Sequence, residues 1–170
     1  MLAAKSSKEA DKIITLFTKD HGKLVVIAKG VKKISSRKRG NIELFSHIKT
    51  SIVNSHDFGL MTEAQLLESF ENIRKSLKKT AVAYFMVEVV AKVAQQEEKN
   101  IEIFDLLLNY LGKVNSSGKL KEIRENFTKD ILTVLGFWPR GRSMLEPDII
   151  LEQILERRPH TVRIAKKLFY

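Results

Sequence analysis

Residues 12–28, KIITLFTKDHGKLVVIA, contain two short apolar runs separated by a turn. The runs at 12–18 and 23–28 are rich in Ile, Val, Leu and Phe, which favour β-strands. Between them, Gly22 suits the positive φ angle of a short hairpin loop, and Asp20 is a common turn residue. This stretch therefore predicts a β-hairpin.

Short strands are predicted throughout the first 70 residues. Ile48, Thr50 and Ile52 alternate with polar neighbours, as in a half-buried strand. Residues 60–68, LMTEAQLLE, contain helix-favouring residues, but their position after the turn HDFG at 56–59 favours a closing strand. The residues predicted on one side of this strand are Leu60, Thr62, Ala64 and Leu66. Four or five strands in 70 residues predict a small antiparallel barrel.

From about residue 73 the apolar residues follow the spacing of helices. A central buried helix is predicted first, with Leu77, Ala81, Tyr84, Phe85, Val89 and Val93 on its apolar stripe. Three more helices are predicted at 101–114, 120–135 and 148–157, and Gly136 is placed as a C-terminal cap. The segment 137–142, FWPRGR, is the only later stretch dense in Pro, Gly and Arg.

The change of period near residue 70 predicts an α+β protein of two parts. A small β-barrel at 1–70 is followed by an all-α helical domain at 71–170, and the two are expected to pack against each other. The chain has no cysteine and no apolar run of membrane-spanning length. We therefore expect a cytoplasmic protein without a membrane segment.

The segment 29–39, KGVKKISSRKR, is the most basic part of a chain whose formal net charge is +10. It has six cations, no acidic residue and no periodicity that would tie it to a core, so its cations are expected to project into solvent. Neutralisation of phosphates explains such a density; the alternative is a loop that is basic only for solubility. The predicted phosphate-contacting residues are Lys29, Lys32, Lys33, Arg37, Lys38 and Arg39, and Lys19 and Lys23 of the hairpin would extend the surface. A second, weaker basic set is Arg140, Arg142, Arg157, Arg158, Arg163, Lys166 and Lys167.

No aromatic residue lies within this basic segment, so the sequence predicts nucleic-acid binding with little base preference. Phe45 and Phe58 are the nearest aromatic residues, and both are expected to pack in the core of the strands.

Signatures of enzymes are weak or absent in the sequence. No phosphate-binding G-x-x-x-x-G-K-[ST] motif is present. His47 and His56, beside Asp57, are a weak candidate for a metal corner, and ordinary strand-end histidines are the favoured interpretation. Glu88 is a candidate for a buried acid, but pairing with a nearby Lys or Arg is favoured. We expect no enzymatic activity, no metal and no cofactor.

Several motifs resemble the N-terminal part of the RecO family of bacterial recombination mediators. The likeness runs from residue 9 to about residue 95. It includes E-A-D-x-I-x-T-x-F-T-x-x-x-G-K from residue 9, followed by A-K-G at 28–30 and S-R-x-x-G at 36–40. LFSHIKT at 44–50 and LMTEAQLLESFENIRKSL at 60–77 continue it. Beyond residue 95 the likeness is one of helical organisation, with LGFWP at 135–139 as a turn.

The resemblance implies an OB-fold at 1–70, followed by a helical domain at 71–170. It also implies binding of single- and double-stranded DNA, annealing of complementary strands, and work with RecR to load RecA onto DNA coated by single-strand-binding protein. DNA would bind the basic face of the OB-fold, which maps onto the six cations of 29–39. The acidic tail of single-strand-binding protein would bind the helical domain, where no motif locates it.

This chain departs from the family pattern in its cysteines and in its two ends. Many members carry a four-cysteine zinc motif that is absent here, so no zinc is expected. Only MLAAKSSK precedes the E-A-D motif, where the family has a hydrophobic first strand. Either the sequence starts late, or the barrel lacks part of a strand, which would leave an open edge. The C-terminal half also looks shorter than is usual.

Two other functional classes remain open on the sequence. One is an interaction scaffold that binds acidic protein tails, with DNA contact incidental. The other is an RNA-binding OB-fold protein.

Overall fold

The computed structural model describes residues 1–7, 9–34, 36, 40–53 and 58–155. The chain forms two compact units: residues 1–70 together with 94–100 make the first, and residues 71–93 together with those from 101 onward make the second. We call residues 94–100, which link two helices of the second unit, the connector. Within the described ranges, no helix is long and apolar enough to cross a membrane.

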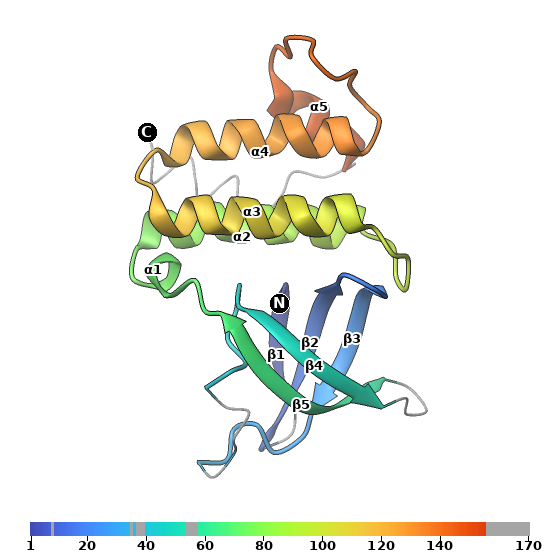
Figure 1. Ribbon diagram of the computed structural model, residues 1–170, viewed down its shortest axis with the longest axis vertical. Helices are drawn as coiled ribbons and strands as arrows, with labels where there is room; N and C mark the ends of the chain where they lie inside the picture. Colours follow the sequence, from blue (N-terminus) through green and yellow to red (C-terminus); the bar gives the residue numbers. More distant parts are fainter. Residues whose placement is uncertain (8, 35, 37–39, 54–57, 156–170) are drawn as a thin grey trace. The chain divides into compact units, whose positions relative to one another are not determined.

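The first unit contains a five-stranded sheet (Figure 1). Its strands are β1 (Ala3–Ser7), β2 (Asp11–Thr18), β3 (Gly22–Ala28), β4 (His47–Val53) and β5 (Gly59–Glu68). Their order is β1-β2-β3-β5-β4, and the sheet is open between β1 and β4. The prediction of a wholly antiparallel barrel was wrong in one respect, because β3 and β5 pair in parallel at Val26↔Gly59 and Ile27↔Leu60. The α+β class with an OB-type sheet is confirmed.

The predicted hairpin is confirmed. Strands β2 and β3 pair from Lys12↔Ala28 to Thr18↔Gly22, and Gly22 adopts a φ of +63°. The hydroxyl of Thr18 donates to the Gly22 carbonyl oxygen at 3.0 Å and accepts from the His21 N–H at 3.0 Å. The turn is therefore held by a side chain as well as by the ladder.

The first strand is present although its sequence is not hydrophobic. Residues Ala3–Ser7 pair antiparallel with β2, from Ala3↔Thr15 to Ser7↔Asp11. These small and polar side chains are mostly exposed, so backbone hydrogen bonds rather than burial hold the strand. A five-residue first strand is therefore present, and the expected open edge is observed.

The side-chain alternation of β5 differs from the prediction. Thr62 and Leu66 are exposed, whereas Met61 is fully buried and Ala64 packs on the core. The register explains this, because Ser51 pairs with Glu63 but the next residue, Ile52, pairs with Met61. The extra residue of this bulge reverses which side chains face inward. The residues of β5 that face the core therefore do not follow strict alternation along the whole strand.

The core of the first unit lies between β2–β3 and β4–β5. Its buried side chains are Ile14, Leu16, Val26, Ala28, Val31, Ile42 and Met61, and Ile48 and Ile52 pack against them from β4, as predicted.

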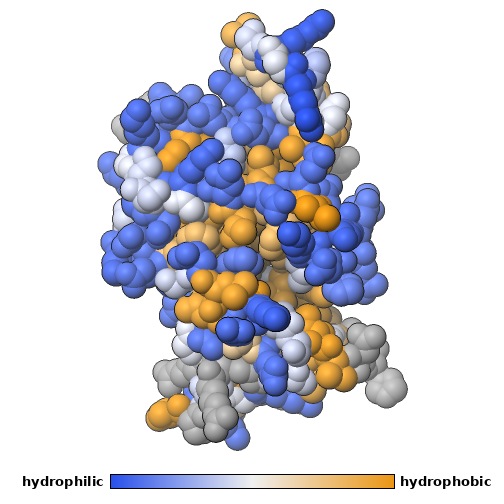
Figure 2. Space-filling model, viewed as in Figure 1, coloured by the Kyte–Doolittle hydropathy of each residue, from blue (hydrophilic) through white to orange (hydrophobic). Residues whose placement is uncertain are grey.

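The second unit consists of helices (Figure 1). They are α1 (Glu71–Arg74), α2 (Leu77–Val93), α3 (Ile101–Ser116), α4 (Leu120–Val134) and α5 (Pro147–Ile154). Buried residues surround most of α2, as predicted, but Leu77 and Tyr84 of its expected stripe are exposed. Figure 2 shows mainly hydrophilic residues over the visible helical surface, with hydrophobic residues in the seams.

The predicted C-terminal cap of α4 is confirmed. Gly136 has a φ of +81°, and its N–H donates to the Thr133 carbonyl oxygen at 3.0 Å. The N–H of Phe137 donates to the Leu132 carbonyl oxygen at 3.0 Å. This pair of bonds is a Schellman motif, in which glycine supplies the left-handed residue.

An aromatic cluster joins α2, α3 and α4. The ring of Phe127 lies 6.2 Å from that of Phe85 and 5.4 Å from that of Tyr110, with both pairs edge to face. The Tyr110 hydroxyl also donates to Asp130 Oδ2 at 2.6 Å. Burial, with this bond and the carboxylate charge, raises the pKa of Tyr110.

Replacing Phe127 with Ala should lower the free energy of unfolding by about 3–5 kcal/mol, because it leaves a cavity among three helices. The matched control is Phe137→Ala, at a side chain that is 53% exposed, and it should cost less than about 1 kcal/mol. Urea unfolding followed by circular dichroism measures both. Equal losses would contradict the proposed packing role of Phe127.

Tyr110 should also make the fold sensitive to base. Its pKa is raised in the folded protein, so its stabilising effect is complete below the unfolded-state pKa of about 10 and is lost as the pH rises above it. In urea titrations between pH 9 and 11.5, Tyr110→Phe should lose stability less steeply than the wild type, by up to about 1.4 kcal/mol per pH unit. Parallel curves for the two proteins would refute this.

Candidate nucleic-acid interface

The basic segment begins with two turns fixed to the sheet. The N–H of Gly30 donates to Asp11 Oδ1 at 2.8 Å, and the N–H of Lys32 donates to the Ala10 carbonyl oxygen at 3.0 Å. Further bonds from Lys33 to Gly30 and from Ser36 to Lys33 close the turns. Between these anchors, Val31 is only 1% exposed and belongs to the core. The prediction that nothing ties this segment to a core was therefore wrong for its first half.

The described cations of the segment lie on the outside of this anchored part. Lys29 and Lys33 are exposed and Lys32 is half-buried. Ile34, beside them, is 92% exposed. Arg37, Lys38 and Arg39 lie outside the described residues, so their predicted role stays a prediction.

Register adds one cation that the sequence analysis did not select. Lys12, the second residue of β2, pairs with Ala28 and so lies next to Lys29 at the same end of the sheet. The sequence could have located Lys12, because the turn fixes the register of a hairpin. Once Thr18 pairs with Gly22, the residue opposite Ala28 must be Lys12. Directly opposite residues share a face, so the Lys12 side chain lies on the face of the buried Ala28. The register therefore places Lys12 at this end of the sheet but does not place it on one surface with Lys29.

Lys23 lies at the other end of β3. Lys29 lies six residues after Lys23, a separation of roughly 20 Å along an extended chain, so the structure does not bring these two lysines together. The backbone of Lys23 pairs with the connector, through a bridge to Gln96 and a 3.1 Å bond from the Glu97 N–H to its carbonyl oxygen. The connector is acidic at Glu97 and Glu98. Lys23 therefore lies apart from the cations of the basic segment, and its predicted role in DNA contact stays a prediction.

The two nearby aromatic residues differ in burial. Phe45 is 2% exposed, as predicted, whereas Phe58 is 41% exposed and was wrongly expected in the core. Phe58 directly precedes β5 and follows residues outside the described ranges.

The weaker chemical candidates have ordinary roles where they are described. Glu88 lies 3.3 Å from Lys92 one helical turn away, as favoured by the sequence. Partial burial lowers the pKa of His47, against an opposing effect of Glu68. His56 and Asp57 lie outside the described residues. Among the residues that are described, no three His, Asp or Glu side chains gather as a metal site.

The second basic set is only partly described. The Arg140 guanidinium Nη2 lies 3.7 Å from Glu102 Oε2. The Arg142 carbonyl oxygen accepts a hydrogen bond from the indole N–H of Trp138. The members outside the described residues are Arg157, Arg158, Arg163, Lys166 and Lys167.

Comparison with known proteins gives two family matches. Residues 1–70 match the family described as Recombination protein O N terminal, and residues 74–144 match Recombination protein O C terminal. Similar proteins named DNA repair protein RecO occur in Dehalococcoides mccartyi strain 195 (32% identity, covering 79% of this chain and 53% of the relative) and Roseiflexus sp. strain RS-1 (30% identity, 78% and 46%). That of Halalkalibacterium halodurans is 25% identical, over 95% of this chain and 72% of the relative. The chain thus spans about half the length of the first two.

The Asp11 anchor should contribute measurable stability. Asp11→Ala removes a partly buried acceptor of a backbone N–H, so the free energy of unfolding should fall by about 1.5–3 kcal/mol. Asp20→Ala, at the exposed hairpin turn, is the matched control and should change it by less than about 0.5 kcal/mol. Chemical unfolding measures both, and equal effects would argue against the anchor.

Proposed function

The chain belongs to the RecO family of DNA repair proteins, and on this premise we propose that it is a non-enzymatic, DNA-binding recombination mediator. The observation that carries the proposal is the anchored basic segment. Residues Lys29, Lys32 and Lys33 project from turns held by Asp11 and Val31, and Lys12 lies at the same end of the sheet. Arg37, Lys38 and Arg39 complete the proposed surface.

The proposed mechanism is electrostatic. Each Lys or Arg placed near a phosphate releases condensed counterions, which favours binding of single- and double-stranded DNA without base preference. If two strands are neutralised at once, their repulsion falls and complementary bases can pair. Annealing of strands therefore follows from the same surface.

Partners are proposed on the basis of the family alone. We infer cooperation with RecR in the loading of RecA, and binding of the tail of single-strand-binding protein to the helical unit. No described contact singles out where these partners bind. The proposal for DNA has more structural support, because Lys29 and Lys33 are exposed on turns anchored to the sheet.

A salt series tests the DNA surface. We expect the affinity for a labelled single-stranded oligonucleotide, measured by fluorescence anisotropy, to fall with a log–log slope of about −4 to −5 for about six phosphate contacts. Alanine at Lys32, Lys33, Arg37, Lys38 and Arg39 should weaken binding and flatten the slope by about 4.

The control variant removes the same number of charges from other exposed lysines, namely Lys49, Lys75, Lys99, Lys119 and Lys121. It should retain most of the affinity. If the two variants behave alike, net charge rather than the basic segment explains binding, and a clear preference for RNA of the same sequence would contradict the proposed role in DNA repair.

A further inference from the structure

The loop that follows α4 is fixed in shape by hydrogen bonds. After the Gly136 cap, the indole Nε1–H of Trp138 donates to the Arg142 carbonyl oxygen at 3.3 Å. Gly141, inside this loop, has a φ of +80°, which glycine adopts without strain. The indole ring therefore has a defined orientation on the helical unit.

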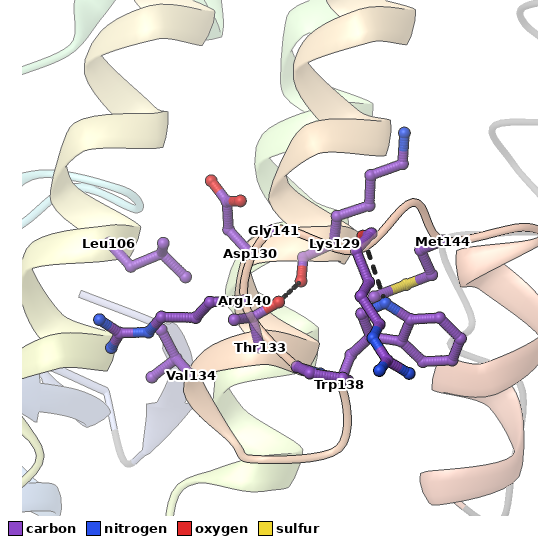
Figure 3. Close-up of a pocket in the computed structure, with 11 residues that line it drawn as sticks. Leu106, Lys129, Asp130, Thr133, Val134, Trp138, Arg140, Gly141 and Met144 are labelled. Atoms are coloured by element: carbon purple, nitrogen blue, oxygen red, sulfur yellow. Dashed lines mark hydrogen bonds between the residues drawn. The ribbon is translucent and has the colours of Figure 1, made fainter.

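Trp138 lines a cavity of about 440 Å³ between α3, α4 and this loop (Figure 3). Leu106, Val134 and Met144 supply apolar walls. The cations Lys129, Arg140 and Arg142 also line it, and the side chains of Lys129 and Arg140 extend in different directions in Figure 3. A cavity of this size can hold a small organic ligand.

The charge of the cavity favours an anion. Among the described residues that line it, Asp130 is the only carboxylate, and it already accepts the Tyr110 hydroxyl at 2.6 Å. Arg140 is paired with Glu102, but both side chains are exposed and 3.7 Å apart, and such pairs are worth little in water. Arg140 can therefore turn to a ligand at low cost.

The indole favours a ligand with a planar ring. Because its N–H is bonded within the loop, Trp138 offers a ring surface and no donor. A ligand that is both anionic and aromatic fits this combination, and a nucleotide of single-stranded DNA is both. An acidic peptide would use the cations and the apolar walls, but it would not need the fixed ring.

We propose that this cavity is a nucleotide subsite, in which one base of single-stranded DNA stacks on Trp138 while Lys129, Arg140 and Arg142 contact the flanking phosphates. The inference rests on the proposed DNA binding and adds a second contact, on the helical unit. It supplies the aromatic surface that the basic segment lacks.

Trp138 is the only tryptophan of the chain, so its intrinsic fluorescence reports on the cavity directly. Titration of the full chain with an unlabelled oligothymidine of about six nucleotides should quench this fluorescence, at the concentration where a labelled copy shows binding by anisotropy. An acidic peptide with an apolar C-terminal end, titrated in parallel, should quench less.

Variants separate the cavity from the basic segment. Trp138→Ala should weaken binding of the short oligonucleotide about 5- to 150-fold, the range for loss of one stacked base. Trp138→Phe, which keeps a ring if the alanine variant does not fold, should weaken it less. Arg142→Gln should weaken it and reduce the salt dependence, whereas Phe137→Ala, at the neighbouring aromatic residue that does not line the cavity, should leave affinity and quenching unchanged.

The outcomes distinguish this inference from the proposed function. Binding by anisotropy without quenching, together with wild-type affinity of the Trp138 and Arg142 variants, overturns the subsite and leaves DNA binding intact. Quenching by the peptide but not by the oligonucleotide also overturns it. If the wild-type chain binds no DNA at moderate salt, both the proposed function and the nucleotide subsite are contradicted.

Discussion

The antiparallel pairing of β2 with β3 is the constraint on which the first unit depends. Seven successive pairs lead from the glycine turn to Lys12↔Ala28, and they decide which side chains enter the core. Because the side-chain period of a strand is two, a slip of one residue would turn Ile14 and Val26 outward. The same pairing sets which cations share an end of the sheet, so the register determines the surface as well as the interior.

A dense group of like charges opposes its own folding, and the anchors offset this repulsion. Burial of Val31 and the bond from Gly30 to Asp11 hold the backbone where the lysines begin. A segment held in this way has less freedom to lose when it meets a polyanion. Asp11 is a carboxylate within a positive surface, and its role there is explained by the backbone N–H that it accepts.

The sequence predicted best those features that depend on local chemistry. Gly22 and Gly136 were located because turns and helix caps need a positive φ, and the long helices were located by their apolar period. The bulge near Thr62, the parallel pairing of β3 with β5 and the exposure of Phe58 depend on contacts between distant segments, which no local pattern encodes. For the site, the basic segment was visible in the sequence, whereas its buried anchor and the separation of Lys23 from Lys29 required the fold.

Because of the connector, the chain passes from one unit to the other more than once. Residues 94–100 belong to the sheet-containing unit although helices of the other unit precede and follow them, so the backbone passes between the units three times. A single cut after Phe70 would therefore leave a fragment without the piece that pairs with Lys23 of β3. The first unit is therefore not a contiguous stretch of sequence, and a gene fusion that copies only the first 70 codons would leave part of it behind.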